Sequence, residues 1–315
     1  MLFGLLALLL ALLLVCSFTP GFFFIRRLRW TPREKLCGSV GLSLILVYLA
    51  AWAIYCFGPQ EERLPFWIVA AVAVLLGAAA WRDAWRLFRS FRIRQALAGV
   101  GFLILWVVTM LAMIRVYSGA GWSSDWFEHF HRSVFFLHRL PPHVTIYPFY
   151  LLPARPPMMN VLSAFFLGLT DDRFALFQVI FGFLNIVLSL PALLLLPALG
   201  DPRRRGLLPL VVLVAINPMV MVNATYSWTK SLTVFYVILA VALYLAGWRN
   251  RDSARTVAAF VALAAACSVH YSAGPYVAFL ALHYLFRFFR ERPWRWRELA
   301  GVMVAAGLVL ATWFA

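Results

Sequence analysis

Acidic residues and histidines gather in residues 121–157 of this 315-residue chain, a long polar segment in an otherwise apolar sequence. If residues 123–137 are helical, Asp125, Glu128 and His129 share one face, because residues three and four apart are neighbours on a helix. A carboxylate beside an imidazole can move a proton. We therefore expect chemistry to start here, and the alternative is an interfacial anchor in which both carboxylates are solvated.

The opposite face of the same segment is apolar and carries Trp126, Phe127, Phe130, Phe135 and Phe136. Such a division is typical of an amphipathic helix lying on a membrane surface. Prolines rule out regular helix from His143 to Pro157, and Tyr147 suits the headgroup region, so this stretch is expected to fold back across a site. The apolar run from Met158 to Leu169 that follows is too short to span a bilayer.

The rest of the chain has the composition of a membrane protein, with 64% hydrophobic and 13% charged residues. Several apolar runs reach the roughly 20 residues that a bilayer requires. We predict an all-α polytopic membrane protein of about ten transmembrane helices, with membrane-parallel helices in a long outer loop. The apolar runs lie near residues 1–25, 38–57, 65–81, 95–117, 174–198, 207–222, 231–247, 256–269, 273–286 and 299–315.

The net charge of +16 is explained by topology, so no nucleic acid is expected as a partner. Basic residues cluster between the apolar runs, as orientation signals do. In alternate loops, 21 of the 28 Lys and Arg residues fall on one side, which is therefore predicted to be cytoplasmic. The long loop then faces outward. The cytoplasmic clusters are at 26–35, 82–94, 203–205, 249–255 and 287–297.

Several other kinds of site are not indicated. The four cysteines lie in or at the edge of apolar runs without paired spacing, which argues against a disulfide framework or a zinc ribbon. The histidines of the loop lack metal-ligand spacing, and hydrogen bonding at headgroup level is the commoner role for such residues. No Walker loop is present in the sequence, so ATP-driven work is not expected.

A known family shares the order of these elements. Asp125 follows a membrane run, the segment ARPPMMNVLSAFFLGL begins at position 154, and Asp171-Asp172 precede the next span. This arrangement resembles the GT-C glycosyltransferases, especially the bacterial protein O-mannosyltransferase and aminoarabinose transferase type. In those relatives the first large outer loop carries an acidic motif, two membrane-parallel helices and a Lys/Arg-Pro-Pro motif. Asp125 and Arg155-Pro156-Pro157 match these motifs.

The resemblance covers about residues 95–290 and implies a division of the chain. Residues 1–94 would be N-terminal helices with three spans, and 95–315 a GT-C-like core with an outer catalytic loop at 118–173. The chain departs from the relatives in three ways: Trp126 replaces a second acid, three helices precede the motif, and the chain ends in an apolar run. A C-terminal outer domain is therefore expected to be absent.

The resemblance also implies an activity. Such enzymes take a sugar from a polyprenyl-phosphate donor and pass it to a lipid, glycan or protein acceptor outside the cytoplasm, usually with inversion. The expected setting is cell-envelope glycosylation in a bacterial inner (plasma) membrane, with membrane lipids around the protein. Asp125 is the candidate general base, with Glu128 beside it. Arg155 and Lys230 are expected to hold the donor phosphate, although either could equally be an interfacial cation.

The remaining candidate residues have alternatives. His129, Tyr147, His270 and Tyr271 are expected to line the substrate cavity, although His270 and Tyr271 could instead satisfy one another where the chain turns back. Glu128 or the Asp171-Asp172 pair is a candidate for a divalent metal ion, and helix capping is favoured for the pair. The rival functions are a transporter or flippase and a non-catalytic membrane partner. No membrane-centre acid or internal repeat in the sequence supports the transporter.

Overall fold

A computed structural model describes residues 2–59, 62–114, 123–145, 155–195, 207–291 and 294–314. Within these ranges every regular element is a helix, which confirms the predicted all-α class. The helices are α1 (Leu2–Cys16), α2 (Thr19–Ile25), α3 (Pro32–Phe57), α4 (Leu64–Ala79), α5 (Trp81–Phe88), α6 (Phe91–Met113), α7 (Ser123–Leu137), α8 (Met158–Gly168), α9 (Phe174–Ile186), α10 (Ser189–Leu195), α11 (Leu207–Ile216), α12 (Pro218–Thr225), α13 (Lys230–Asn250), α14 (Ser253–Val269), the 3-10 helix η2 (Tyr271–Ala273), α15 (Gly274–Arg290) and α16 (Trp296–Phe314).

Six spans in the described residues are long and apolar enough to cross a membrane, or eight if each of two bent helix pairs forms one span. These spans indicate an integral membrane protein. The number of about ten transmembrane helices, which includes shorter helices such as α14, stays a prediction.

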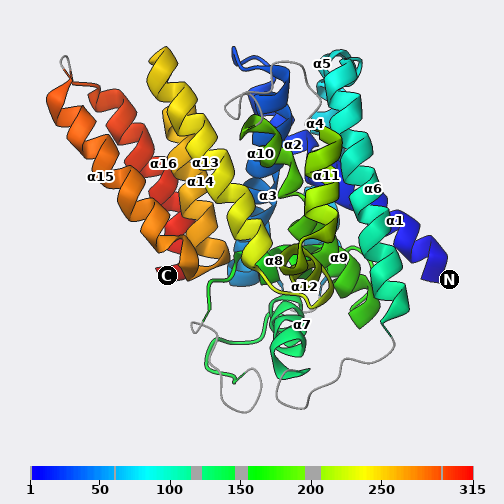
Figure 1. Cartoon of the computed structure of the whole chain (residues 1–315). Helices are drawn as coiled ribbons and strands as arrows, with labels where there is room; N and C mark the ends of the chain where they lie inside the picture. Colours follow the sequence, from blue (N-terminus) through cyan, green and yellow to red (C-terminus); the bar gives the residue numbers. More distant parts are fainter. Residues whose placement is uncertain are drawn as a thin grey trace.

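Most of the longer helices run between two ends of the bundle (Figure 1), and these ends differ in the side chains that they carry. Contacts join four of the predicted basic clusters at one end, which we call the arginine-rich end. Arg26 Nε lies 3.6 Å from Asp83 Oδ2, Arg255 Nη2 donates to Arg29 O at 3.0 Å, and Arg295 Nη1 donates to Arg251 O at 3.2 Å. Residues 203–205 lie outside the described residues. Helix α7 lies at the opposite end, which we call the α7 end (Figure 1).

One sharp bend lies at the end of the span predicted at 65–81, and another breaks the span predicted at 207–222. Helices α4 and α5 meet at 71°, and α5 is a helix within the cluster at 82–94 that was predicted to be a loop. Helices α11 and α12 meet at 63° at Asn217-Pro218, because proline lacks an N–H and disfavours helix in the preceding residue. The Asn217 side chain caps α12 by accepting from Met219 N at 2.9 Å and Val220 N at 3.2 Å.

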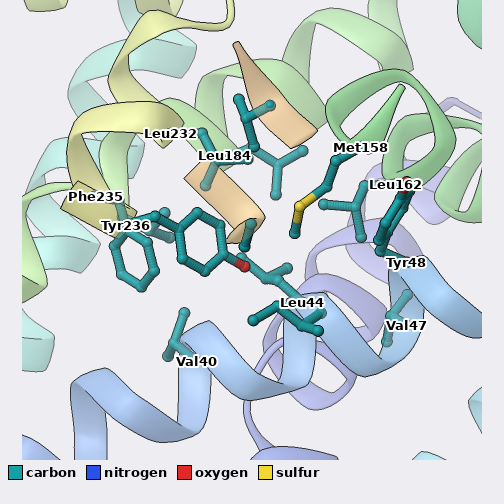
Figure 2. Packing of buried hydrophobic residues seen from close by; sticks show 14 of the residues in the cluster. Val40, Leu44, Val47, Tyr48, Met158, Leu162, Leu184, Leu232, Phe235 and Tyr236 are labelled. Atoms are coloured by element: carbon teal, nitrogen blue, oxygen red, sulfur yellow. The ribbon is translucent and has the colours of Figure 1, made fainter. Parts of the chain in front are cut away.

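Helix α3 contributes to the core, where its apolar side chains pack with those of α8, α9 and α13 (Figure 2). Tyr236 Oη donates to Gly41 O at 3.0 Å, and a Cβ on Gly41 would come within 2.7 Å of Leu239 Cδ2, so glycine permits the close approach of α13. All residues of the short helix α8 are buried, so this helix is part of the core. Figure 2 labels Val40, Leu44, Val47 and Tyr48 of α3, Met158 and Leu162 of α8, Leu184 of α9, and Leu232, Phe235 and Tyr236 of α13.

A buried ion pair ties α14 to α3 at the arginine-rich end. Arg255 Nε donates to Glu34 Oε1 at 2.9 Å and Nη2 donates to Oε2 at 3.0 Å, and both residues are buried. Glu34 also completes the capping box with Thr31 at the start of α3. This arrangement predicts that Arg255 stabilises the fold, besides contributing to the basic cluster at 249–255 that orients the chain in the membrane.

Glu34→Gln is expected to lower the free energy of unfolding by about 2 kcal/mol, because it removes one of the two carboxylates, Glu34 and Asp252, that pair with the buried guanidinium of Arg255. Thermal unfolding of the detergent-solubilised protein measures this loss. The matched control is Glu291→Gln, whose carboxylate also pairs with an arginine but is 54% exposed, and it is expected to cost less than about 1 kcal/mol. Equal losses in the two variants would contradict the structural role of the pair.

Candidate functional site

Helix α7 forms where the amphipathic pattern predicted it, but its aromatic face packs on protein. Phe136 lies 5.0 Å from Tyr55 of α3, and Phe130 lies 5.3 Å from Phe177 of α9, measured between ring centroids. Phe135 is also buried. The prediction that this face seeks lipid is therefore wrong for these residues, because aromatic side chains of α3 and α9 cover it.

The polar face of α7 is buried as well, and Glu128 lies between two guanidinium groups. Its Oε1 accepts from Arg132 Nε at 2.7 Å, and its Oε2 lies 3.2 Å from Arg155 Nη2. Only 2% of Glu128 and 1% of Arg132 are exposed. The alternative of a solvated anchor is therefore wrong for Glu128, whose carboxylate orients Arg155.

Asp125 lies in the first turn of α7, one helical turn before Glu128. This backbone position puts residues 125 and 128 on the same helical face, as the spacing predicted. The Asp125 side chain lies outside the described residues, so its role as general base stays a prediction.

His129 is buried beside this ion pair and is held by a hydrogen bond. Its Nδ1 lies 3.1 Å from Asn160 Oδ1 of α8. Burial, followed by the positive charge of Arg155, lowers the pKa of His129 to about 3. The ring is therefore neutral at physiological pH, and since Asn160 Oδ1 can only accept, His129 Nδ1 donates and Nε2 keeps a lone pair.

Lys230 and His270 interact electrostatically with this cluster. Lys230 is the first residue of α13, is exposed, and places Nζ 4.7 Å from the centroid of the Trp228 ring. Burial, followed by the positive charges of Lys230 and Arg155, lowers the pKa of His270. The two predicted phosphate-binding cations therefore act on the same imidazole, although they are 75 positions apart in the chain.

The chain turns back after α14 at His270, as predicted. His270 Nδ1 accepts from Ser272 N at 3.1 Å, and its ring stacks on Tyr271 with centroids 4.2 Å apart. These contacts agree with the alternative that the turn residues satisfy one another. Tyr271 is nevertheless 62% exposed, so its ring remains open to a ligand. Tyr147 lies outside the described residues.

The acidic pair between α8 and α9 contacts an arginine and a histidine. Asp171 Oδ2 accepts from Arg173 Nε at 2.6 Å, and Asp172 Oδ2 lies 3.5 Å from His138 Nε2. Although desolvation opposes it, hydrogen bonds to Asp172 and Arg173 lower the pKa of Asp171. No side-chain hydrogen bond caps α9, whose N-cap residue is Arg173, so the favoured capping interpretation is wrong.

These two carboxylates do not fit a divalent metal site, because their oxygens already contact the side chains of Arg173 and His138. The described part of the chain contains no group of three or more His, Cys, Asp or Glu residues that could hold a metal ion. The divalent metal ion stays a prediction, and nothing below depends on it.

Sequence reasoning missed two residues of this cluster, Arg132 and Asn160. Arg132 was counted only as a basic residue of the outer side, although its spacing of four from Glu128 is that of a helical ion pair. Asn160 stands in an apolar run directly after Arg155-Pro156-Pro157, and such a polar residue in a buried helix requires a partner. These two signals were present in the sequence.

The low pKa of His129 predicts a pH-dependent stability. The unfolded chain takes up a proton near pH 6.5, whereas the folded ring does so only near pH 3. Above pH 6.5, His129 does not make the free energy of unfolding depend on pH. Between about pH 6.5 and about pH 3, the free energy of unfolding falls by about 1.4 kcal/mol for each pH unit because of this residue. The midpoint temperature of unfolding should therefore fall less for His129→Gln than for wild type when the pH is lowered from about 7 to about 5. His143→Gln, which changes an exposed imidazole, should keep the wild-type dependence. Parallel pH profiles for all three proteins would contradict this assignment.

Comparison with known proteins finds no relative: no family model, no curated protein and no solved structure matches the chain. The class that the fold defines is therefore an all-helical protein with the apolar helices of an integral membrane protein. At its α7 end, Glu128, His129, Arg155 and their neighbours form a partly buried polar cluster.

Proposed function

We propose that this protein is a membrane glycosyltransferase that moves a sugar from a polyprenyl-phosphate donor to an acceptor outside the cytoplasm. The observation that carries the proposal is the contact of Arg155 with Glu128, at 3.2 Å, on the helix that also carries Asp125. The positive charges of Arg155 and Lys230 both lower the pKa of His270, which agrees with a cationic site at this end of the bundle. A donor phosphate requires cations, and an acceptor hydroxyl requires a carboxylate nearby. Both requirements are met by residues of one end of the bundle.

The two cations have different parts in the proposed binding of the donor phosphate. Arg155 offers a planar fork that suits phosphate oxygens, and its contact with Glu128 at 3.2 Å orients the guanidinium. Lys230 is exposed and makes no ion pair with the described residues, so its full charge is available to the phosphate. The pKa values of His129 and His270 are lowered, so neither imidazole adds positive charge to the cluster.

The proposed reaction is an inverting displacement at the anomeric carbon. The acceptor oxygen or nitrogen forms a bond to this carbon as its bond to the phosphate oxygen breaks. The bonding electrons go to the phosphate, which Arg155 and Lys230 stabilise, and the acceptor proton goes to the Asp125 carboxylate. Glu128 acts as a positioning residue for Arg155 because its two oxygens are already held by guanidinium groups.

The distribution of charge supports an outward-facing site. Four basic clusters meet at the arginine-rich end, and positive loops favour the cytoplasmic side. The α7 end is then extracytoplasmic, where a polyprenyl-phosphate donor serves acceptors of the cell envelope. A bacterial inner membrane is the proposed location.

Lys230→Ala tests the phosphate-binding part of the proposal. Its dissociation constant for a radiolabelled polyprenyl phosphate should rise about tenfold, which is the effect of losing one charge-assisted contact. The control is Arg63→Ala, which removes an exposed cation from the same end of the bundle and should change affinity less than about twofold. Equal effects would mean that general surface charge, and not this cluster, attracts the carrier. Equilibrium binding to the purified protein in lipid nanodiscs measures both.

A further inference from the structure

A second polar cavity lies at the arginine-rich end, at the end of α13 opposite to the candidate site. It has a volume of about 370 Å³. Helix α13 begins at Lys230 and is capped by Arg251, so roughly 30 Å separates the two ends of the helix. The cavity therefore cannot be part of the donor site. Its lining comes from the ends of four helices and includes Arg251, Arg287, Arg295, Trp248, Phe288 and Trp294.

The charge of this cavity favours an anion. Three arginines line it against two glutamates, Glu291 and Glu298, which leaves an excess of one positive charge. Arg287 is paired with Glu291 at 2.8 Å and Arg295 with Glu298 at 3.2 Å. Arg251 is exposed and makes no ion pair with any described residue. Its guanidinium is therefore the group available to a ligand.

A buried hydroxyl in the same cavity also lacks a partner. Tyr284 is 5% exposed, and its Oη makes no complete hydrogen bond within the described residues, although the Glu298 carboxylate is nearby. Buried polar groups are normally hydrogen-bonded, because an unmade bond costs free energy. An oxygen-rich ligand in the cavity would supply the missing bond.

An apolar groove continues from this cavity along the bundle. The groove has a volume of about 660 Å³, lies between α13 and α15, and shares Trp248 with the polar cavity. Arg287 lies over the Trp248 ring at 4.8 Å, so this tryptophan borders both the cationic cavity and the apolar groove. The groove is lined by Val241, Leu245, Tyr276, Phe279 and Leu280, among others.

We propose that the cavity and the groove together bind one anionic phospholipid from the leaflet at the arginine-rich end. The phosphate contacts Arg251 and Tyr284, and an acyl chain fills the groove between α13 and α15. Charge complementarity selects the anionic headgroup, and the continuity of the two spaces at Trp248 selects a lipid over a soluble phosphate. This binding does not depend on the proposed glycosyl transfer.

Native mass spectrometry of the purified full chain tests the headgroup contact by titration with phosphatidylglycerol and, separately, with phosphatidylcholine. Arg251→Asn removes the charge and suits the left-handed backbone at this residue, where φ is 50°. Its affinity for phosphatidylglycerol should fall about fivefold or more. The matched control Arg249→Gln removes an exposed charge that does not line the cavity and should change affinity less than about twofold.

A second variant and a soluble competitor test the acyl-chain contact. Leu245→Trp, at a residue that is 37% exposed, narrows the groove and should also weaken phosphatidylglycerol binding. Glycerol phosphate, a headgroup without acyl chains, should not displace the lipid. Equal binding of the two lipids, equal effects of Arg251→Asn and Arg249→Gln, or displacement by glycerol phosphate would each overturn the proposal.

Discussion

Sugar transfer by the Asp125→Asn variant is expected to fall by a factor of about 100 to 10,000, which is the usual contribution of general acid or base catalysis. Asparagine keeps the size of the side chain but cannot take the acceptor proton. The Michaelis constant for the donor should stay close to that of wild type, because the phosphate contacts belong to Arg155 and Lys230. Initial rates with a saturating polyprenyl-phosphate donor in proteoliposomes measure the loss.

The matched control for this variant is Glu62→Gln, which neutralises an exposed carboxylate at the same end of the bundle. Its rate should equal that of wild type. A rate for Asp125→Asn within about twofold of that control would remove Asp125 from the chemistry. A rise in the donor Michaelis constant without loss of maximal rate would instead assign Asp125 to binding.

Glu128→Gln is expected to lower the free energy of unfolding by about 3 kcal/mol, because it neutralises a buried carboxylate that contacts two guanidinium groups, those of Arg132 and Arg155. Denaturant unfolding in detergent measures the loss. Glu291→Gln, whose carboxylate is 54% exposed, serves again as the control, with an expected change of less than about 1 kcal/mol.

A double variant separates charge from packing in this pair. Glu128→Gln with Arg132→Gln removes both members, so its loss should be smaller than the sum of the two single losses. Strict additivity would mean that the two side chains do not stabilise one another. That result would contradict the buried ion pair.

Periodicity was sufficient to predict α7, since apolar and polar residues alternate there with the spacing of a helix. It could not predict what covers the apolar face. Phe130 and Phe136 are suited to lipid and to protein alike, and only the packing of α3 and α9 decides in favour of protein. The same ambiguity applies to α8, whose short length was evident but whose complete burial was not.

The turn at His270 was predictable because an apolar run that returns to the same side must reverse. The proximity of Arg155 and Lys230 to this turn is tertiary and has no local signal in the sequence. The break at Asn217-Pro218 had a local signal in its proline, but the capping role of Asn217 follows from geometry. Most helices could therefore be predicted, whereas the assembled cluster could not.

The central claim is tested most directly by sugar transfer in proteoliposomes, with a panel of radiolabelled polyprenyl-phosphate sugars and a membrane extract as acceptor source. The account predicts labelled product with wild type, an unaltered Michaelis constant but little product with Asp125→Asn, and a raised Michaelis constant with Lys230→Ala. Transport of intact donor across the bilayer without cleavage of the sugar–phosphate bond, at equal rates in all three proteins, would contradict it.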